Sequence, residues 1–322
     1  MRGLLKGKPA GTQFLIFISI TLASFFLLGI AGTIILSQVT GMGLLEMSDS
    51  SKWNYADGQI VTVIRAMQAI QLVCLFLVPT YLCASLFSTD SKKYLGLKAP
   101  SNGRYYIAGI VILLLAIPLT NLLGELNRSV RFPAGVENWM KTQEEEAAKS
   151  FKLLLSDQSV TDLILNIFFI AGFAAVGEEL LFRGLAQRLL IRLFKSPLAG
   201  ILIASFLFSA MHMQFYGFLP RFTLGILLGL VYWYSGSLWV SILAHFVYDT
   251  FLIIIVYKNP ALLNDENALK LSNIALAGGI SVALVTALVV WMKKRSTVTY
   301  ENVFDGDAVK NHPFDFEQNT PV

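Results

Sequence analysis

Two adjacent glutamates and an arginine, Glu178, Glu179 and Arg183, lie in a stretch of sequence that is otherwise apolar enough to cross a lipid bilayer. A charge at the bilayer centre costs about 3 kcal/mol on insertion scales, so a chain keeps one where it pairs, lines a wet cavity or does chemistry. In a helix, Glu179 and Arg183 share a face and can pair. Glu178 points about 100° away and has no partner on its own helix. We therefore expect Glu179 to be neutralised locally and Glu178 to be available for chemistry.

Two of the three histidines also fall in hydrophobic segments, where an ionisable side chain indicates a function by default. His212 follows Phe208 by four residues and His245 precedes Asp249 by four, so each histidine has a neighbour on its own helical face. Asp249 is placed to fix the tautomer of His245 or to share a ligand with it. The third histidine, His312, lies in a polar tail, and we expect it to be exposed and inert.

One glutamate and two histidines on separate hydrophobic segments are compatible with two hydrolytic mechanisms. In one, Glu178 is a general base that activates water, and the histidines polarise a carbonyl. In the other, Glu178, His212 and His245 bind a divalent metal such as zinc, with an open position for water. The sequence has no HExxH motif, which excludes the ordinary zincin arrangement. From spacing alone, a proton-coupled transporter with these residues as its relay is an equal alternative, although no internal repeat supports it.

The composition indicates a membrane protein. Of the 322 residues, 55% are hydrophobic and only 14% are charged, against roughly 25% charged in soluble domains. The net charge of +4 is dispersed, and no basic run is interleaved with aromatic residues, which argues against nucleic-acid binding. Cys74 and Cys83 fall in one hydrophobic segment, and we interpret them as buried thiols.

Hydrophobic runs separated by polar connections predict an all-α, polytopic membrane protein with about eight transmembrane helices and the polar site inside the bundle. The first run is too long for the core of a signal peptide and is expected to be a retained helix. Pro118 predicts a kink in the third helix. Ser159 and Ser196 have the pattern of N-caps that open the fourth and fifth helices. The expected helices span residues 14–36, 61–87, 106–123, 159–195, 196–213, 218–234, 237–257 and 274–292.

The long polar connection before the fourth helix predicts an amphipathic helix over residues 137–155, which lies at the membrane interface and carries a Glu145–Lys149 pair. We divide the chain into an N-terminal three-span region that includes this helix, a catalytic five-span core and a disordered cytoplasmic tail. These divisions cover residues 1–157, 158–295 and 296–322. Gly225 and Gly229 form a GxxxG pattern, which we interpret as an internal packing seam rather than a dimer face.

Lysine and arginine flank the N-terminus, the second-to-third connection, the end of the fourth helix and the C-terminus. The positive-inside rule therefore predicts that both termini are cytoplasmic. His245 and His212 lie about 12 Å and 22 Å from the starts of their helices. For both to meet Glu178, we expect the fourth and fifth helices to project into the cytoplasm and to form a water-accessible cavity open to that side. Groups that share one water should lie within about 8–10 Å of each other.

The polar motifs, in this order and on separate helices, resemble the signature of the CPBP (Abi) family of intramembrane proteases. They read Glu178-Glu179-x-x-x-Arg183, Phe208-x-x-x-His212 and His245-x-x-x-Asp249. That family includes the endoprotease that trims the CAAX box of prenylated proteins, along with bacteriocin-processing and self-immunity relatives in bacteria. The resemblance covers residues 162–251, roughly a quarter of the chain. It implies a multi-pass endopeptidase of a bacterial cytoplasmic membrane that acts on a membrane-associated peptide or protein.

By this resemblance, Glu178 is the base that activates water and His212 lies beside it. Glu179, Arg183 and Phe208 are supporting residues, which agrees with the pairing derived above.

His245 and Asp249 are implied to stabilise the oxyanion, and here the sequence departs from the commoner pattern, which has Asn at the last position. Asn donates a hydrogen bond, whereas an ionised Asp only accepts one. Asp249 must then be protonated, orient His245 or ligate a metal. The resemblance leaves metal-assisted and metal-free routes open. It also leaves a non-catalytic scaffold or self-immunity protein as an alternative.

Overall fold

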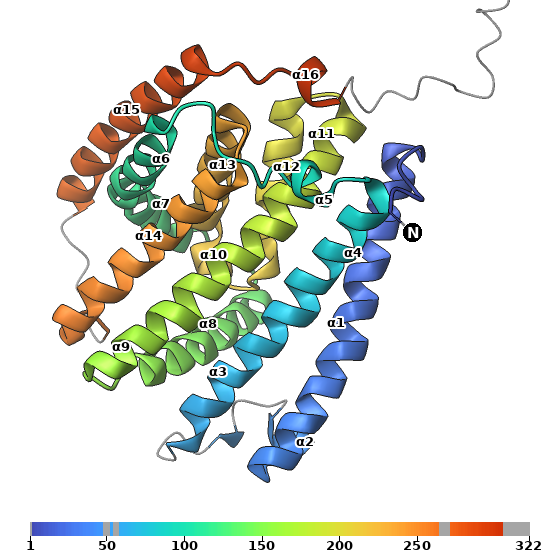
Figure 1. Cartoon of the computed structure of the whole chain (residues 1–322). Coiled ribbons are helices and arrows are strands. Elements are labelled where there is room, and N and C mark those ends of the chain that lie inside the picture. Colours follow the sequence, from blue (N-terminus) through green and yellow to red (C-terminus); the bar gives the residue numbers. More distant parts are fainter. Residues whose placement is uncertain (1, 48–51, 54–57, 264–270, 305–322) are drawn as a thin grey trace, which may run out of the picture.

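The computed structural model of the chain describes residues 2–47, 52–53, 58–263 and 271–304. Every element within these residues is a helix, and the long helices lie side by side along a common direction (Figure 1). Within the described part of the chain, seven helical stretches are long and apolar enough to cross a membrane. The predicted all-α, polytopic fold is thus confirmed.

The seven stretches match seven of the eight expected helices, and the remaining one, the fifth, is α12, an apolar helix of only 15 residues. The second and fourth stretches are continuous but contain π-helical turns, which widen the helix locally. The seven stretches are α1 (Ala10–Thr40); α3, η2 and α4 (Gln59–Gln71, Leu72–Leu77, Val78–Phe87); α6 and α7 (Arg104–Leu115, Ile117–Ser129); α9, η3, α10, η4 and α11 (Val160–Asn166, Ile167–Gly172, Phe173–Glu178, Glu179–Gln187, Arg188–Phe194); η5 and α13 (Phe215–Gly217, Phe218–Ser235); α14 (Leu238–Lys258); and α15 (Leu271–Arg295). Outside them lie α2 (Leu44–Met47), α5 (Ser91–Tyr94), α8 (Ala134–Leu154), α12 (Pro197–Met211), η6 (Pro260–Leu263) and α16 (Tyr300–Phe304).

The helix boundaries follow the local signals in the sequence. The Ser159 hydroxyl accepts a hydrogen bond from the Asp162 backbone N–H at 3.1 Å, and Ser196 caps α12 through the Ala199 N–H at 3.3 Å. Pro118 lies in the first turn of α7, directly after the break that separates α7 from α6. Both predicted caps are therefore present, and the helix is interrupted directly before Pro118, where the kink is predicted.

The helices alternate in direction, so their connections gather at two ends of the bundle (Figure 1). One end holds the turn before α1 together with α5, α11 and α16, and we call it the basic end for reasons given below. The other end holds α2, α8, η5 and η6, and we call it the α8 end. Hydrogen bonds between connections stabilise each end. Leu238 N–H donates to the Gly96 carbonyl at the basic end, at 2.9 Å, and Tyr257 O–H donates to the Gln158 carbonyl at the α8 end, at 2.6 Å.

Two expectations outside the spans are corrected. In α8 the described ion pair is Glu137 with Lys141, at 3.0 Å, and the exposed side chains of the expected Glu145–Lys149 pair do not form one. The hydrogen bond from Lys141 and the charge of Glu137 raise the pKa of the Lys141 ammonium. The tail is expected to be disordered from residue 296, but part of it forms α16. This helix is held in place because Phe304 is buried against apolar side chains of the bundle. Residues 305–322 lie outside the described residues.

The predicted division of the chain near residue 157 stays a prediction. The buried core contains residues from both sides of it. Side chains of α6, including Tyr105 and Ile112, pack in one buried cluster with side chains of α13, α14 and α15. On the opposite side, Arg65 of α3 forms an ion pair with Asp162 and donates to the Asn166 side chain of α9 at 2.9 Å. The N-terminal spans therefore help to hold the C-terminal ones in place.

The GxxxG pattern forms an internal seam, as predicted. A Cβ atom at Gly225 would lie 2.9 Å from the Cβ of Ser205 on α12, and one at Gly229 would lie 2.7 Å from the Gln187 side-chain oxygen. Small residues of this kind let membrane helices approach closely, and packing rather than the hydrophobic effect then holds them together.

Gly225→Ala should therefore destabilise the protein by about 1–3 kcal/mol, since the added methyl group meets a neighbouring helix close to its backbone. The matched control is Gly279→Ala in α15, where a new Cβ meets no atom within 4 Å. The measurement is thermal unfolding of both variants in detergent. A Gly225→Ala melting curve that coincides with that of Gly279→Ala would contradict the close packing.

Candidate active site

Three helices bring one carboxylate and two imidazoles together. Glu178 ends α10, His212 directly follows α12, and His245 lies in α14. The Glu178 carboxylate is 3.8 Å from His212 Nε2 through one oxygen and 4.0 Å from His245 Nε2 through the other. These separations are well inside the limit expected for groups that share one water. The predicted convergence on one pocket is therefore present, whereas the catalytic roles of the residues stay predictions.

Directly beside this pocket, the second glutamate forms the predicted local ion pair. Glu179 Oε1 lies 2.8 Å from the Arg183 guanidinium, and both side chains are almost completely buried. Arg183 also donates to the Gly225 carbonyl of α13 at 3.2 Å and stacks on the Phe208 ring of α12 at 4.5 Å. The pair is thus fixed by contacts on two other helices.

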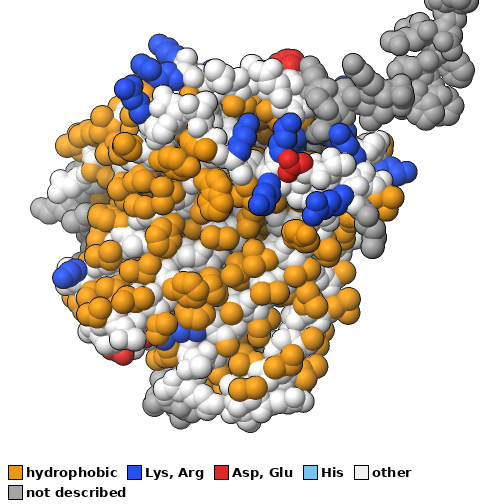
Figure 2. Space-filling view, viewed as in Figure 1, with side chains coloured by type: hydrophobic (Ala, Val, Ile, Leu, Met, Phe, Trp, Pro, Cys, Tyr) orange, Lys and Arg blue, Asp and Glu red, His pale blue; other side chains and the backbone are white. Residues whose placement is uncertain are grey.

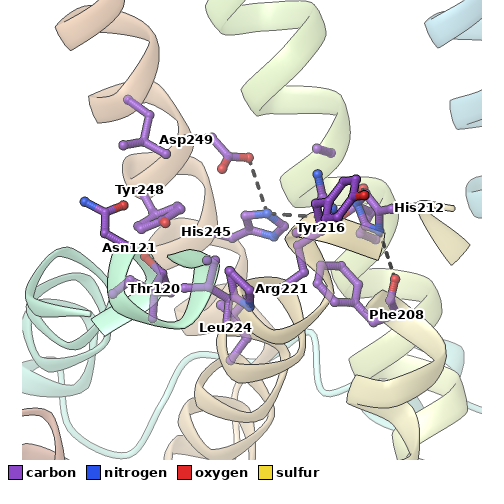
Figure 3. A pocket seen from close by; sticks show the side chains of 18 of the residues that line it. Thr120, Asn121, Phe208, His212, Tyr216, Arg221, Leu224, His245, Tyr248 and Asp249 are labelled. Carbon is purple, nitrogen blue, oxygen red and sulfur yellow. Dashed lines mark hydrogen bonds and ion pairs between the residues drawn. The ribbon is translucent and has the colours of Figure 1, made fainter. Parts of the chain in front are cut away.

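His245 lies between two carboxylates. Its Nδ1 faces Glu179 Oε1 at 3.1 Å and its Nε2 faces Asp249 Oδ2 at 3.3 Å, which Figure 3 shows for the Asp249 side. Both neighbours are acceptors when ionised, so this arrangement suits an imidazolium that carries a hydrogen on each nitrogen. Three roles are considered for Asp249: a protonated acid, a residue that orients His245, or a metal ligand. The geometry supports the second of these roles.

His212 has a different environment. Its Nδ1 lies 2.9 Å from the Phe208 carbonyl oxygen, which accepts hydrogen bonds and cannot donate them. We therefore assign the hydrogen to Nδ1, which leaves Nε2 as an acceptor that faces Glu178. Two acceptors 3.8 Å apart can be bridged by one water that donates to both.

The Phe208 ring is the common apolar contact of the site. It makes edge-on contacts with three rings, at centroid distances of 5.1 Å to His212, 6.4 Å to His245 and 5.3 Å to Phe182. Such contacts fix the planes of both imidazoles. The supporting role predicted for Phe208 thus has a geometric basis.

A cavity of about 700 Å³ contains the site. Besides Glu178, His212, His245 and Asp249, polar side chains from α7, α8, η5 and the start of α13 line it. They include Asn121, Glu125, Arg128, Glu144, Tyr216 and Arg221, several of which are labelled in Figure 3.

The position of this cavity bears on two of the predictions about orientation. Its lining continues to exposed residues such as Arg128 at the α8 end, and none of the described residues of the basic end lines it. The cavity therefore opens at the α8 end. This end is opposite to the one that holds the N-terminus and the last residues of α15 (Figure 1). Cytoplasmic termini and a cavity open to the cytoplasm are incompatible in this fold, so the two predictions cannot both hold.

Comparison with known proteins bears on the same segment. Residues 160–251 match the family model described as type II CAAX prenyl endopeptidase Rce1-like. The predicted resemblance is confirmed. Within this Rce1-like segment lie all the motif residues named above.

A curated relative of the chain has a description that names no activity. Over 118 residues the chain is 29% identical to a Bacillus subtilis (strain 168) protein described as uncharacterized protein YpbD. This alignment covers 35% of the chain and 56% of that protein, so the chain spans just over half the length of the curated relative it matches. No solved structure matches the chain.

The donor atoms of the Rce1-like segment do not fit the metal site considered from the sequence. Ligands on a tetrahedral zinc ion at about 2.0–2.1 Å lie about 3.3 Å from one another. Here the Glu178 oxygens are 3.8 Å and 4.0 Å from the two histidine nitrogens, and His245 Nε2 already faces Asp249. No group of three or more His, Cys, Asp or Glu side chains in the described residues has an arrangement that could hold a metal ion.

Sequence reasoning missed Arg221, which lies in the first turn of α13 and lines the cavity. Its guanidinium donates to the backbone carbonyl of Gln214 at 3.0 Å and to the side-chain oxygen of the same residue. A lone arginine in an apolar helix was the available signal, because such a charge must face a partner or a cavity. Arg65 in α3 carried the same signal, and its partner Asp162 lies 97 residues away.

The two adjacent glutamates should respond differently to the same substitution. Glu179→Gln removes the counter-charge of buried Arg183 and should cost about 3–5 kcal/mol of stability. Glu178→Gln is the matched control, because no lysine or arginine pairs with Glu178 among the described residues. Thermal unfolding in detergent measures both. Equal losses of stability would show that the two carboxylates do not have separate roles.

Proposed function

We propose that the chain is an intramembrane endopeptidase of the CAAX type, which hydrolyses a peptide bond of a membrane-associated peptide or protein with water activated by Glu178. The observation that carries this proposal is the Glu178 carboxylate within 4.0 Å of two imidazoles, in a polar cavity of an otherwise apolar bundle. The match of residues 160–251 to a family of endopeptidases supports it.

The attacking water would lie between Glu178 and His212. It donates one hydrogen to the Glu178 carboxylate and the other to His212 Nε2, which is the acceptor in the tautomer assigned above. As its oxygen attacks the carbonyl carbon, Glu178 takes up the proton. When the tetrahedral intermediate collapses, this proton passes to the leaving nitrogen, and the products are a carboxylic acid, which keeps the second hydrogen of the water, and an amine. Proton transfer between them then gives a carboxylate and an ammonium group.

His245 would stabilise the oxyanion of the intermediate. Because Glu179 and Asp249 face its two nitrogens, it is held as a cation with a fixed ring plane beside the reacting carbon. A preorganised cation of this kind lowers the energy of developing negative charge without reorganisation during the reaction. Asp249 would act through His245, as a positioning residue.

Removing the base tests this mechanism. Glu178→Gln should lower the rate of peptide hydrolysis by about 10²–10⁴-fold, since the amide cannot accept the proton of the water. Purified protein in lipid nanodiscs, assayed with a library of quenched fluorescent peptides, gives the measurement. Glu137→Gln on α8, which lies outside the cavity, is the control and should keep the wild-type rate. Turnover by Glu178→Gln at the rate of this control would remove Glu178 from the mechanism.

Chelation separates the metal-free route from a metal-assisted one. Because the donor geometry does not suit a metal ion, incubation with EDTA or phenanthroline should leave peptide hydrolysis unchanged. The assay is the same, and the metal content of the purified protein is determined in parallel. Loss of activity that stoichiometric zinc restores would overturn the metal-free route.

A further inference from the structure

The cavity opens at the end of the bundle that carries fewer basic residues. Arginine and lysine side chains gather at the other end, beside α5, α11 and the last turn of α15, and Figure 2 shows the corresponding blue cluster over the upper part of the molecule. In the described residues this basic end holds Arg2, Lys6, Lys8, Lys92, Lys93, Lys98, Arg104, Arg188, Arg192, Lys195, Lys293, Lys294 and Arg295. Two acidic residues, Asp90 and Glu301, lie among them.

The α8 end has a mixed charge. Among the described residues of this end, carboxylates and basic groups occur in similar numbers, and several of them form local ion pairs, such as Glu125 with Arg128 and Glu137 with Lys141. Basic residues that flank transmembrane helices are retained on the cytoplasmic side, whereas acidic residues contribute little to orientation. The contrast between the two ends therefore orients the whole bundle.

We propose that the candidate site is open to the extracytoplasmic side of the membrane, so that its substrate is a peptide segment presented at the outer surface. The class that fits is the membrane-proximal segment of an exported or membrane-anchored polypeptide. That the bound peptide is a substrate rests on the proposed function, whereas the direction in which the cavity opens does not depend on it.

The α8 helix lies where such a segment would approach. It is amphipathic, and its Trp139 ring contacts the Phe215 ring of η5 at a centroid distance of 5.4 Å. Aromatic side chains of this kind favour the membrane–water interface. A second cavity of about 260 Å³ lies between α8 and the residues after α12, and His212 lines both cavities. The two cavities therefore border the same imidazole, one on the side of α8 and one at the site.

Thiol labelling of the full-length protein in intact cells tests the orientation without requiring hydrolysis. Arg128→Cys places a thiol at the exposed rim of the cavity, and Lys294→Cys places one at the basic end. The native chain is the background control, because Cys74 and Cys83 are both buried. A membrane-impermeant maleimide should label Arg128→Cys in intact cells, and Lys294→Cys only after lysis.

The reverse pattern would overturn the proposal, and so would equal labelling of both positions in cells whose cytoplasmic marker protein stays unlabelled. Thr142→Cys, exposed on α8, is a second reporter in case Arg128→Cys fails to accumulate in the membrane. Peptides added outside the cells then test the proposed function separately. Labelling of Arg128→Cys without cleavage of any peptide would leave the orientation intact and contradict the hydrolytic activity.

Discussion

The structure depends most on the buried ion pair between Glu179 and Arg183. Removing two charges from water is costly, and the cost is repaid only where geometry and additional contacts are good. Here the pair contacts three neighbouring helices, through the Gly225 carbonyl of α13, the Phe208 ring of α12 and His245 of α14. These are also the helices that carry the remaining site residues. One electrostatic requirement therefore both stabilises the bundle and aligns the candidate catalytic groups.

Two consecutive glutamates acquire different properties from their positions on one helix. Glu179 is within 3.1 Å of cationic or hydrogen-bonding partners on two helices, and its role is structural. Glu178, one residue earlier, lies at 3.8–4.0 Å from its nearest ionisable partners and lines the cavity. Two nearby carboxylates in different environments often have different roles in a protein. The π-helical turn of η4, which begins at Glu179, marks the point where the environment changes.

The sequence was sufficient for what depends on local spacing. The caps at Ser159 and Ser196, the pairing of Glu179 with Arg183 and the helix order all follow from residues a few positions apart. It was insufficient where distant elements meet. The direction in which the cavity opens is set by how α7, α8 and η5 pack, and no local pattern encodes that. The formation of α16 likewise depends on the burial of Phe304 against helices that are distant in the sequence.

The shortness of α12 explains why polar residues surround the site. Fifteen residues rise about 22 Å, whereas the hydrocarbon core is about 30 Å thick, so α12 alone is too short to cross it, and irregular backbone follows Met211. Such backbone is tolerated only where its polar groups are satisfied inside the protein or by water in a cavity. Asn127 donates to the Phe215 carbonyl at 2.6 Å and accepts from the Leu219 N–H at 3.1 Å. Arg221 contributes in the same way by donating to the Gln214 carbonyl. The interruption that ends α12 at His212 therefore requires polar surroundings, which are also the environment that the proposed activation of water by Glu178 needs.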